Sequence, residues 1–149
     1  MIDDLSVIHQ LYNADLNTNL LFRPKDTYRM RGGGRAVSKT TGTNHPNGVI
    51  TYFNLKDLKD DDKVSLTYFD KKGDTIKTYS NTSKKNKLSV EKGANQYVWN
   101  MTYDGAERLP GMILWWASLE GPRATPGTYK VSLKVNDDVQ SQSFKILAD

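Results

Sequence analysis

Two adjacent tryptophans, Trp115 and Trp116, are the residues of this sequence whose type and position point most directly to binding chemistry. They lie in residues 104–125, a stretch without strand-like alternation that prolines and glycines interrupt. An indole face can stack on the apolar face of a sugar ring, and Arg108 and Arg123 in the same stretch can donate hydrogen bonds to sugar hydroxyls. Connections of this length in a compact β domain are often functional.

The same tryptophans have two other interpretations, and the sequence leaves all three open. The run MILWW, residues 112–116, is too apolar to stay in water, so part of it must be buried in this domain or against another. Since adjacent residues of an extended chain point to opposite faces, one indole can fill the core while the other faces outward. The alternatives are therefore core packing, contact with a neighbouring domain, and a glycan platform.

The sequence offers no matched catalytic set. No Gly-x-Ser-x-Gly elbow occurs, and no serine has an obvious histidine partner. Glu107 and Glu120 lie in the same long stretch and could meet as a glycosidase pair, but each is better explained as a surface residue of a loop. The triple glycine at residues 32–34 lacks the following Lys-Ser/Thr and the strand–helix context of a phosphate-binding loop. We therefore expect no catalytic residue.

Metal-binding residues are also scarce in the sequence. There is no cysteine, which excludes disulfides and thiolate metal sites. The two histidines, His9 and His45, are far apart and would need carboxylates to complete a zinc site. The acidic runs at residues 60–62 and 137–138 fall in expected turns without EF-hand spacing, so we interpret them as solvated turns. We expect no metal and no cofactor.

The length and composition fit a single domain. The chain has 149 residues, of which 37% are hydrophobic and 26% charged, enough for a packed core of modest size. Its net charge of +4 is scattered among acidic residues, which argues against nucleic-acid binding. No apolar run approaches the roughly 20 residues that a membrane-spanning helix needs. The acidic start, MIDDLSVIHQ, lacks the basic region of a signal peptide, and we expect this domain to be part of a longer chain.

From residue 49 onward the sequence has the alternation of β-strands. The strongest alternation runs from Tyr97 to Tyr103, and residues 129–135 repeat it. Pro24 permits only an edge strand or a strand break in the segment before the long polar loop at residues 31–48. The predicted strands are residues 49–55, 63–70, 75–80, 94–103, 127–135 and 143–146. With turn signals at short intervals and no long helix, we count about seven strands and predict an all-β fold, an antiparallel β-sandwich of the immunoglobulin or fibronectin-III type.

The first residues follow a different pattern. Leu5, Ile8 and Tyr12 have helical spacing, which predicts either a short helix or a linker that docks on a neighbouring domain. We therefore divide the chain into residues 1–19, an exit segment from an upstream domain, and residues 20–149, the β-sandwich domain. Leu5 and Ile8 are expected to contact the upstream domain.

Five segments of the sequence together resemble a C-terminal region found in bacterial sortilin-like β-propeller proteins, which are often labelled BNR-repeat glycosyl hydrolases. The segments are LFRPKDTYRM, NGVITYFNL, ANQYVWNMTYDGA, PGMILWWASLEGPRATPGTYKVSLKV and SFKI. The resemblance covers roughly residues 20–149. It implies a non-catalytic immunoglobulin-like sandwich appended to an exported propeller, and no catalytic residue of the family maps onto this chain.

The functional expectation follows from this resemblance. We expect an accessory domain at the C-terminus of a secreted, periplasmic or cell-surface protein, which packs against the upstream β-propeller or binds another protein. The two tryptophans, Trp115 and Trp116, are expected to share that contact with the N-terminal apolar residues. The alternative is a carbohydrate-binding module in which one of these tryptophans stacks on a sugar beside Arg108 or Arg123.

Overall fold

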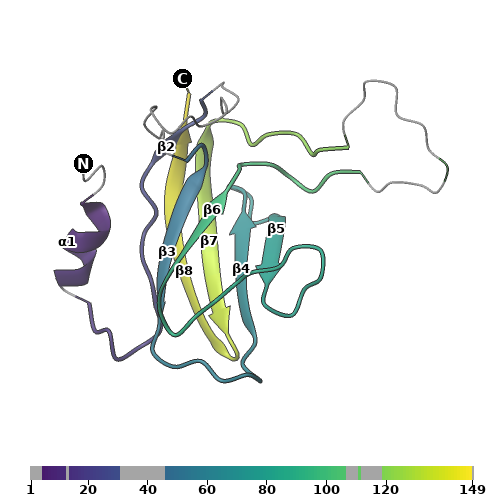
Figure 1. Cartoon of the computed structure of the whole chain (residues 1–149). Helices are drawn as coiled ribbons and strands as arrows, with labels where there is room; N and C mark the ends of the chain where they lie inside the picture. The colour runs from purple at the N-terminus through teal and green to yellow at the C-terminus, as the bar shows by residue number, and fades with distance from the viewer. Residues whose placement is uncertain (1–4, 13, 31–45, 107–110, 112–118, 149) are drawn as a thin grey trace, which may run out of the picture.

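The computed structural model describes residues 5–12, 14–30, 46–106, 111 and 119–148 of the chain. In these residues one short helix accompanies eight strands, against about seven strands predicted, so the predicted all-β class is confirmed. In chain order the elements are α1 (Ser6–Tyr12), β1 (Leu20–Leu21), β2 (Thr27–Tyr28), β3 (Val49–Leu55), β4 (Val64–Phe69), β5 (Thr75–Ser80), β6 (Gly93–Trp99), β7 (Gly127–Val135) and β8 (Asp138–Leu147) (Figure 1).

The described strands form two sheets that pack against each other as a sandwich (Figure 1). One sheet has the order β1-β3-β6 and the other the order β2-β8-β7-β4-β5. All pairs are antiparallel as predicted, with one correction: β2 runs parallel to β8, with Thr27 opposite Ile146. The reason lies at Pro24, between β1 and β2, where the chain leaves the first sheet and joins the second without reversing direction. Proline has no N–H to donate, so the ladder cannot continue through it, and of the two alternatives that Pro24 left open the structure has the strand break.

Alternate side chains fill the space between the sheets. The inward residues of β7, all at most 7% exposed, are those that the alternation predicts: Tyr129, Val131, Leu133 and Val135. Trp99 of β6 is fully buried and stacks on Tyr68 of β4, with 4.5 Å between ring centroids. Tyr129 and Phe144 meet the same indole nearly edge-on, at 6.2 and 6.5 Å. An aromatic cluster therefore joins the two sheets at their centre.

β6 is shorter than the sequence predicts. The alternation extends to Tyr103, but the strand ends at Trp99. Met101 has a φ of 60°, in the left-handed region that does not fit a pleated strand, and its side chain is nevertheless fully buried. The indole N–H of Trp99 donates to the Thr102 carbonyl at 3.1 Å and closes this turn. Burial therefore continues to alternate past Trp99, although the backbone has left the sheet.

Two tyrosines at the centre and rim of this core have raised pKa values. Burial raises the pKa of Tyr68 well above the usual range of a phenol, because the charged form would lose its hydration. Burial also raises the pKa of Tyr79, and the adjacent Tyr97 phenol raises it further. Both phenols are therefore neutral in the folded protein at any pH near neutrality.

We expect the folded state to lose stability as the pH rises above about 10, the pKa of a tyrosine in an unfolded chain. Because the folded-state pKa of Tyr68 and Tyr79 is raised, their contribution to stability is fully present below that pH and is lost as the pH rises toward their folded pKa. Phenolate absorbance and near-ultraviolet circular dichroism, followed together against pH, test this. The phenolate absorbance of the tyrosines that ionise at the highest pH should appear only as the dichroism is lost, and it should be smaller in Tyr68→Phe. Complete ionisation of all eight tyrosines before any change in dichroism would contradict it.

Candidate functional site

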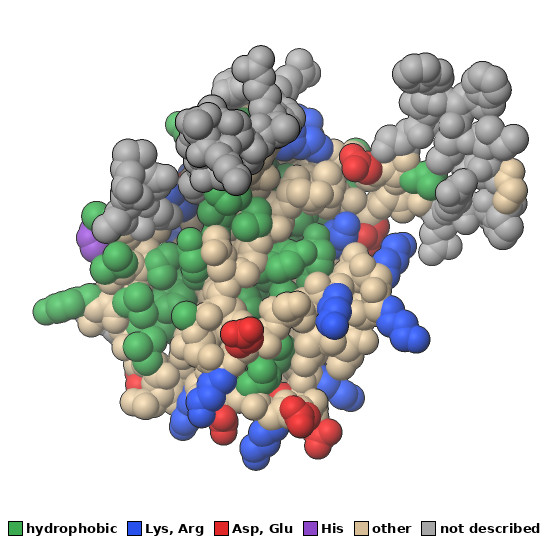
Figure 2. All heavy atoms as spheres, viewed as in Figure 1, with side chains coloured by type: hydrophobic (Ala, Val, Ile, Leu, Met, Phe, Trp, Pro, Cys, Tyr) green, Lys and Arg blue, Asp and Glu red, His purple; other side chains and the backbone are tan. Residues whose placement is uncertain are grey.

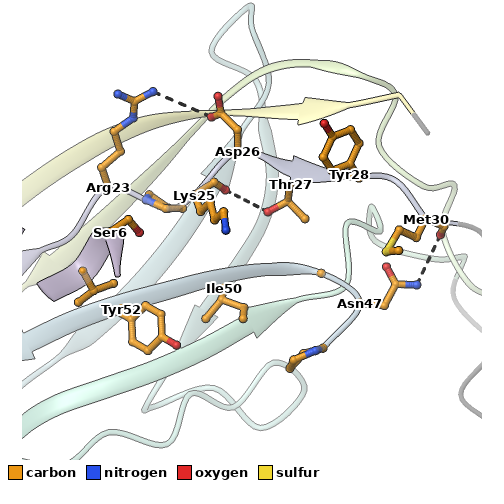
Figure 3. A pocket seen from close by; sticks show the side chains of 14 residues that line it. Ser6, Arg23, Lys25, Asp26, Thr27, Tyr28, Met30, Asn47, Ile50 and Tyr52 are labelled. Atoms are coloured by element: carbon orange, nitrogen blue, oxygen red, sulfur yellow. Dashed lines mark hydrogen bonds and ion pairs between the residues drawn. The ribbon is translucent and has the colours of Figure 1, made fainter. Parts of the chain in front are cut away.

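A groove of about 320 Å³ lies where the chain crosses from one sheet to the other (Figure 3). The outer side of β3 contributes Ile50 and Tyr52 to it, and α1 contributes Ser6 and Val7. The rest of the lining comes from the crossing segment and from the residues just before β3: Arg23, Pro24, Lys25, Asp26, Thr27, Tyr28, Met30, Pro46, Asn47 and Gly48. The groove therefore exists only because α1, the crossing segment and β3 lie side by side.

The side chain of Gln10 holds α1 at this groove. Its Oε1 accepts a hydrogen bond from the Arg23 backbone N–H at 2.7 Å, and its Nε2 donates to the Arg23 carbonyl at 3.1 Å. Both backbone groups of Arg23 are thus satisfied by one amide side chain, in the manner of a strand partner. Since Pro24 interrupts strand pairing at the next residue, this contact supplies the pairing that a sheet would otherwise give.

Three apolar residues of the N-terminal segment are exposed to solvent. Leu5, Ile8 and Tyr12 lie at spacings of three and four and are 48%, 52% and 91% exposed. We call these three residues the α1 stripe. None of the seven residues of α1, all of which the structure describes, is buried. A helix this short is unstable alone in water because it makes few hydrogen bonds for the residues it orders. The α1 stripe therefore has the exposure and shape of a contact surface.

Further hydrophobic side chains are exposed on the side of the molecule that carries α1. Figure 2 shows hydrophobic side chains over α1 and over the neighbouring face of the β1-β3-β6 sheet. Leu11 of α1 and Leu16 after it are exposed, and the exposed Tyr28 and Met30 line the groove that α1 also lines. Monomeric proteins rarely expose large contiguous apolar areas, and those that they do expose are commonly binding sites.

Arg123 reaches the opposite end of the groove. Its Nη1 donates to the Met30 carbonyl at 3.0 Å, and its Nη2 donates to Oδ1 of Asn47 at 3.5 Å. Met30 and Asn47 both line the groove, and Asn47 also donates to the Met30 carbonyl. Through its bridge to Thr102, Arg123 belongs to the base of the long connection between β6 and β7. The groove thus joins two regions that the sequence indicated separately, the N-terminal segment and this connection.

The two described flanks of that connection run antiparallel and close together. Tyr103 N–H donates to the Pro122 carbonyl at 3.0 Å. A Cβ on Gly105 would collide with the carbonyl of Leu119, and one on Gly121 would collide with the carbonyl of Tyr103. Only glycine permits backbones to approach this closely. The glycines that mark a loop in the sequence therefore have a packing role at its base.

Of the remaining residues considered from the sequence, several lie outside the described residues: Arg108, Trp115, Trp116, His45, Glu107 and residues 32–34. The three interpretations of the tryptophans therefore stay predictions. His9 lies on α1, and within the described ranges no group of three or more histidine, cysteine, aspartate or glutamate residues could hold an ion.

The groove combines apolar walls with basic groups. Arg23 and Asp26 form an ion pair at 4.0 Å, and Oδ1 of Asp26 also accepts the Lys145 backbone N–H at 2.9 Å. Asp26 is thus engaged in tying the crossing segment to β8. It is the one carboxylate among the described lining residues, which include no histidine to share acid–base work with it. The arrangement offers donors, aromatic rings and apolar contacts, and these suit binding.

No pattern in the sequence predicts this groove. Its lining comes from three separate segments, and no local spacing in any of them indicates a site. The one available signal was Pro24, because a strand break in an otherwise strand-like segment marks a place where the chain can change sheets.

Comparison of this chain with models of protein families, with curated proteins and with solved structures finds no match. The class of the protein comes from its structure: it is a two-sheet β-sandwich domain with an apolar N-terminal surface and an amphipathic groove. In the described part of the chain, no helix has the length and apolar character needed to cross a bilayer.

Proposed function

We propose that this chain is a non-catalytic accessory domain that packs against a neighbouring domain through the α1 stripe. The exposure of Leu5, just before α1, and of Ile8 and Tyr12 on a helix that buries none of its residues carries this proposal. Gln10 fixes the helix to the domain, so the stripe is a positioned surface and not a loose tail. Burying such a surface against a partner is favourable by about 25 cal/mol per Å² of apolar area.

We infer that the partner is the β-propeller of a bacterial sortilin-like protein and that the whole protein is exported. The segments that resemble the C-terminal region of those proteins support this inference. The position of the stripe supports it too: a domain that precedes residue 5 in the same chain would emerge directly beside Leu5 and Ile8.

We also infer an immunoglobulin-like type for the sandwich. In immunoglobulin domains strands B and E share one sheet and strands C, F and G share the other. The partition of β3 with β6, and of β4 with β7 and β8, corresponds to this arrangement. A second supporting feature is Tyr129, near the start of β7, whose hydroxyl donates to the Thr125 carbonyl at 2.6 Å in the manner of a tyrosine corner.

The coding sequence upstream of Met1 gives the first test of this proposal. Propeller-like repeats that follow an export signal would support an accessory domain of an exported propeller protein. An upstream region that encodes neither would overturn the proposed partner and location.

We expect Ile8→Asp to weaken binding between this domain and the upstream propeller domain at least about tenfold, because a carboxylate without a partner would be buried in an apolar contact. The same substitution should change the free energy of unfolding of this domain by less than about 0.5 kcal/mol, since Ile8 is 52% exposed. Titration calorimetry of the two separately produced domains measures the affinity.

Val139→Asp is the matched control for that titration. Val139 is 56% exposed and lies on β8 of the other sheet, so the same charge is introduced away from α1. Equal affinities for the two variants would show that the α1 stripe is not the contact surface.

The alternative of a carbohydrate-binding module has support of its own in the groove, which Tyr28, Tyr52 and Lys25 all line (Figure 3). Tyrosine rings and basic side chains are suitable contacts for a sugar. If this alternative holds, adding an oligosaccharide changes the fluorescence of Trp115 or Trp116, or Tyr28→Ala abolishes oligosaccharide binding. Packing against a propeller requires neither effect.

A further inference from the structure

β6 forms a free edge of the β1-β3-β6 sheet. One side of the strand pairs with β3 along all seven of its residues, and no strand of the described residues pairs with the other side. The other sheet edges are less open to pairing. β1 and β2 have two residues each, and β5 carries Lys77, which forms an ion pair with Asp104 at 3.4 Å.

The register of β3 shows which of its backbone groups point toward β6. The Phe22 N–H donates to the Tyr52 carbonyl at 3.1 Å, on the β1 side of β3. In an antiparallel ladder the N–H and C=O of one residue point to the same side, and the direction alternates along the strand. The backbone groups of Thr51 and Phe53 therefore point away from β1 and toward β6.

The same alternation identifies the outward groups of β6. Thr51 lies opposite Tyr97, so the backbone groups of Tyr97 are bonded to β3. Those of Ala94, Gln96 and Val98 consequently point to the free edge. No hydrogen bond joins the backbone of these three residues to any other described residue. The side chains of Ala94 and Gln96 are exposed, and that of Val98 is half-buried.

The sequence of β6 does not protect this edge. Natural proteins usually shield an exposed edge strand with a charged side chain, a proline or a bulge, because unpaired N–H and C=O groups are a template for another strand. The sequence of β6 is GANQYVW, which has no charged residue and no proline, and its pairing with β3 is regular throughout. An extended polypeptide can therefore add to the sheet here by main-chain hydrogen bonding.

We propose that β6 pairs in antiparallel orientation with β6 of a second copy of this chain, which joins two three-stranded sheets into one. A two-fold axis at Gln96 places Ala94 opposite the partner's Val98, so that every outward N–H and C=O of the three residues gains a partner. Residues 93–99 contain no charged side chain, so no like charges face each other when two copies of the strand pair.

This dimer is independent of the proposed accessory function. β6 is at one edge of its sheet, and α1 lies at the groove beside the crossing segment and β3. Pairing through β6 therefore leaves the α1 stripe open to a neighbouring domain, and the failure of either proposal leaves the other standing.

Sedimentation velocity of the 149-residue chain over a range of protein concentrations tests the dimer. We expect reversible dimerisation that Gln96→Lys weakens at least about tenfold, because two ammonium groups would then face each other across the two-fold axis. Ser141→Lys is the matched control, since it adds the same charge at an exposed position of β8 in the other sheet and should not change dimerisation. Equal weakening by both variants would overturn the proposed interface.

Amide hydrogen exchange of the unmodified chain gives a test that requires no variant. The amides of Ala94, Gln96 and Val98 should exchange rapidly at low protein concentration and slowly at high concentration. Those of Asn95 and Tyr97 should be protected at both concentrations by their bonds to β3. A chain that stays monomeric at every concentration, or a dimer in which the three outward amides still exchange rapidly, would overturn the proposal.

Discussion

Replacing Trp99 with alanine is expected to lower the free energy of unfolding by about 3–5 kcal/mol. The indole is fully buried and occupies the centre of the sandwich, stacked on Tyr68 at 4.5 Å. Alanine would leave a large cavity between the two sheets, and the closely packed side chains around it can relax only in part to fill the space. Because domains of this size are stable by only about 5–15 kcal/mol, this one substitution removes a large share of the total.

Urea unfolding followed by far-ultraviolet circular dichroism measures this loss, since the signal does not depend on the tryptophan that is removed. Trp99→Phe should lose less than Trp99→Ala, because a phenyl ring keeps part of the stacking on Tyr68. Val139→Ala, at a 56% exposed position, is the surface control and should change stability by less than about 0.5 kcal/mol. A loss for Trp99→Ala no greater than that of the control would show that the indole is not part of the packed core.

The hydrogen bond between Thr51 and Tyr68 is expected to give the second large effect. The two hydroxyl oxygens are 2.8 Å apart, both side chains are fully buried, and they belong to different sheets. Tyr68→Phe leaves the Thr51 hydroxyl without this partner in a place that water does not reach. A buried polar group that loses its partner costs about 1–3 kcal/mol, and we expect this loss for Tyr68→Phe and, by the same reasoning, for Thr51→Val.

The double variant tests whether the two residues act through this bond. Tyr68→Phe combined with Thr51→Val removes both hydroxyls and leaves no unsatisfied group, so its loss of stability should be smaller than the sum of the two single losses. Urea unfolding of the four proteins completes the cycle. Strictly additive losses would mean that the two hydroxyls contribute independently and that the bond does not couple the sheets.

Three strands have the bounds that the sequence predicts. The predicted residues 49–55, 75–80 and 127–135 coincide with β3, β5 and β7, although only β7 was predicted from strict alternation. A strand with one buried face must alternate apolar and polar side chains, and this requirement is visible in neighbouring residues alone. The same reasoning extended β6 too far, because Met101 remains buried although its left-handed backbone is no longer part of the sheet.

The candidate site was less accessible to sequence reasoning. Helical spacing indicates Leu5 and Ile8, and both are exposed in the structure. The sequence suggests Arg123 as a donor for a sugar, whereas its guanidinium donates to Met30 and Asn47 at the end of the groove. The groove itself needed the contact of Gln10 with Arg23, thirteen residues away in sequence, which no residue pattern predicts.

The order of apolar and polar residues was sufficient to predict the all-β class and the inward face of β7, because each depends on residues that are adjacent or two apart. The three-dimensional arrangement was needed to show which sheet each strand joins, that β2 lies parallel to β8, that β6 is an edge and that the α1 stripe faces outward. These features depend on pairings such as Leu21 with Phe53 and Thr27 with Ile146. The free energy of such pairings comes from surfaces that meet only after the chain has folded, so the pattern of neighbouring residues does not predict them.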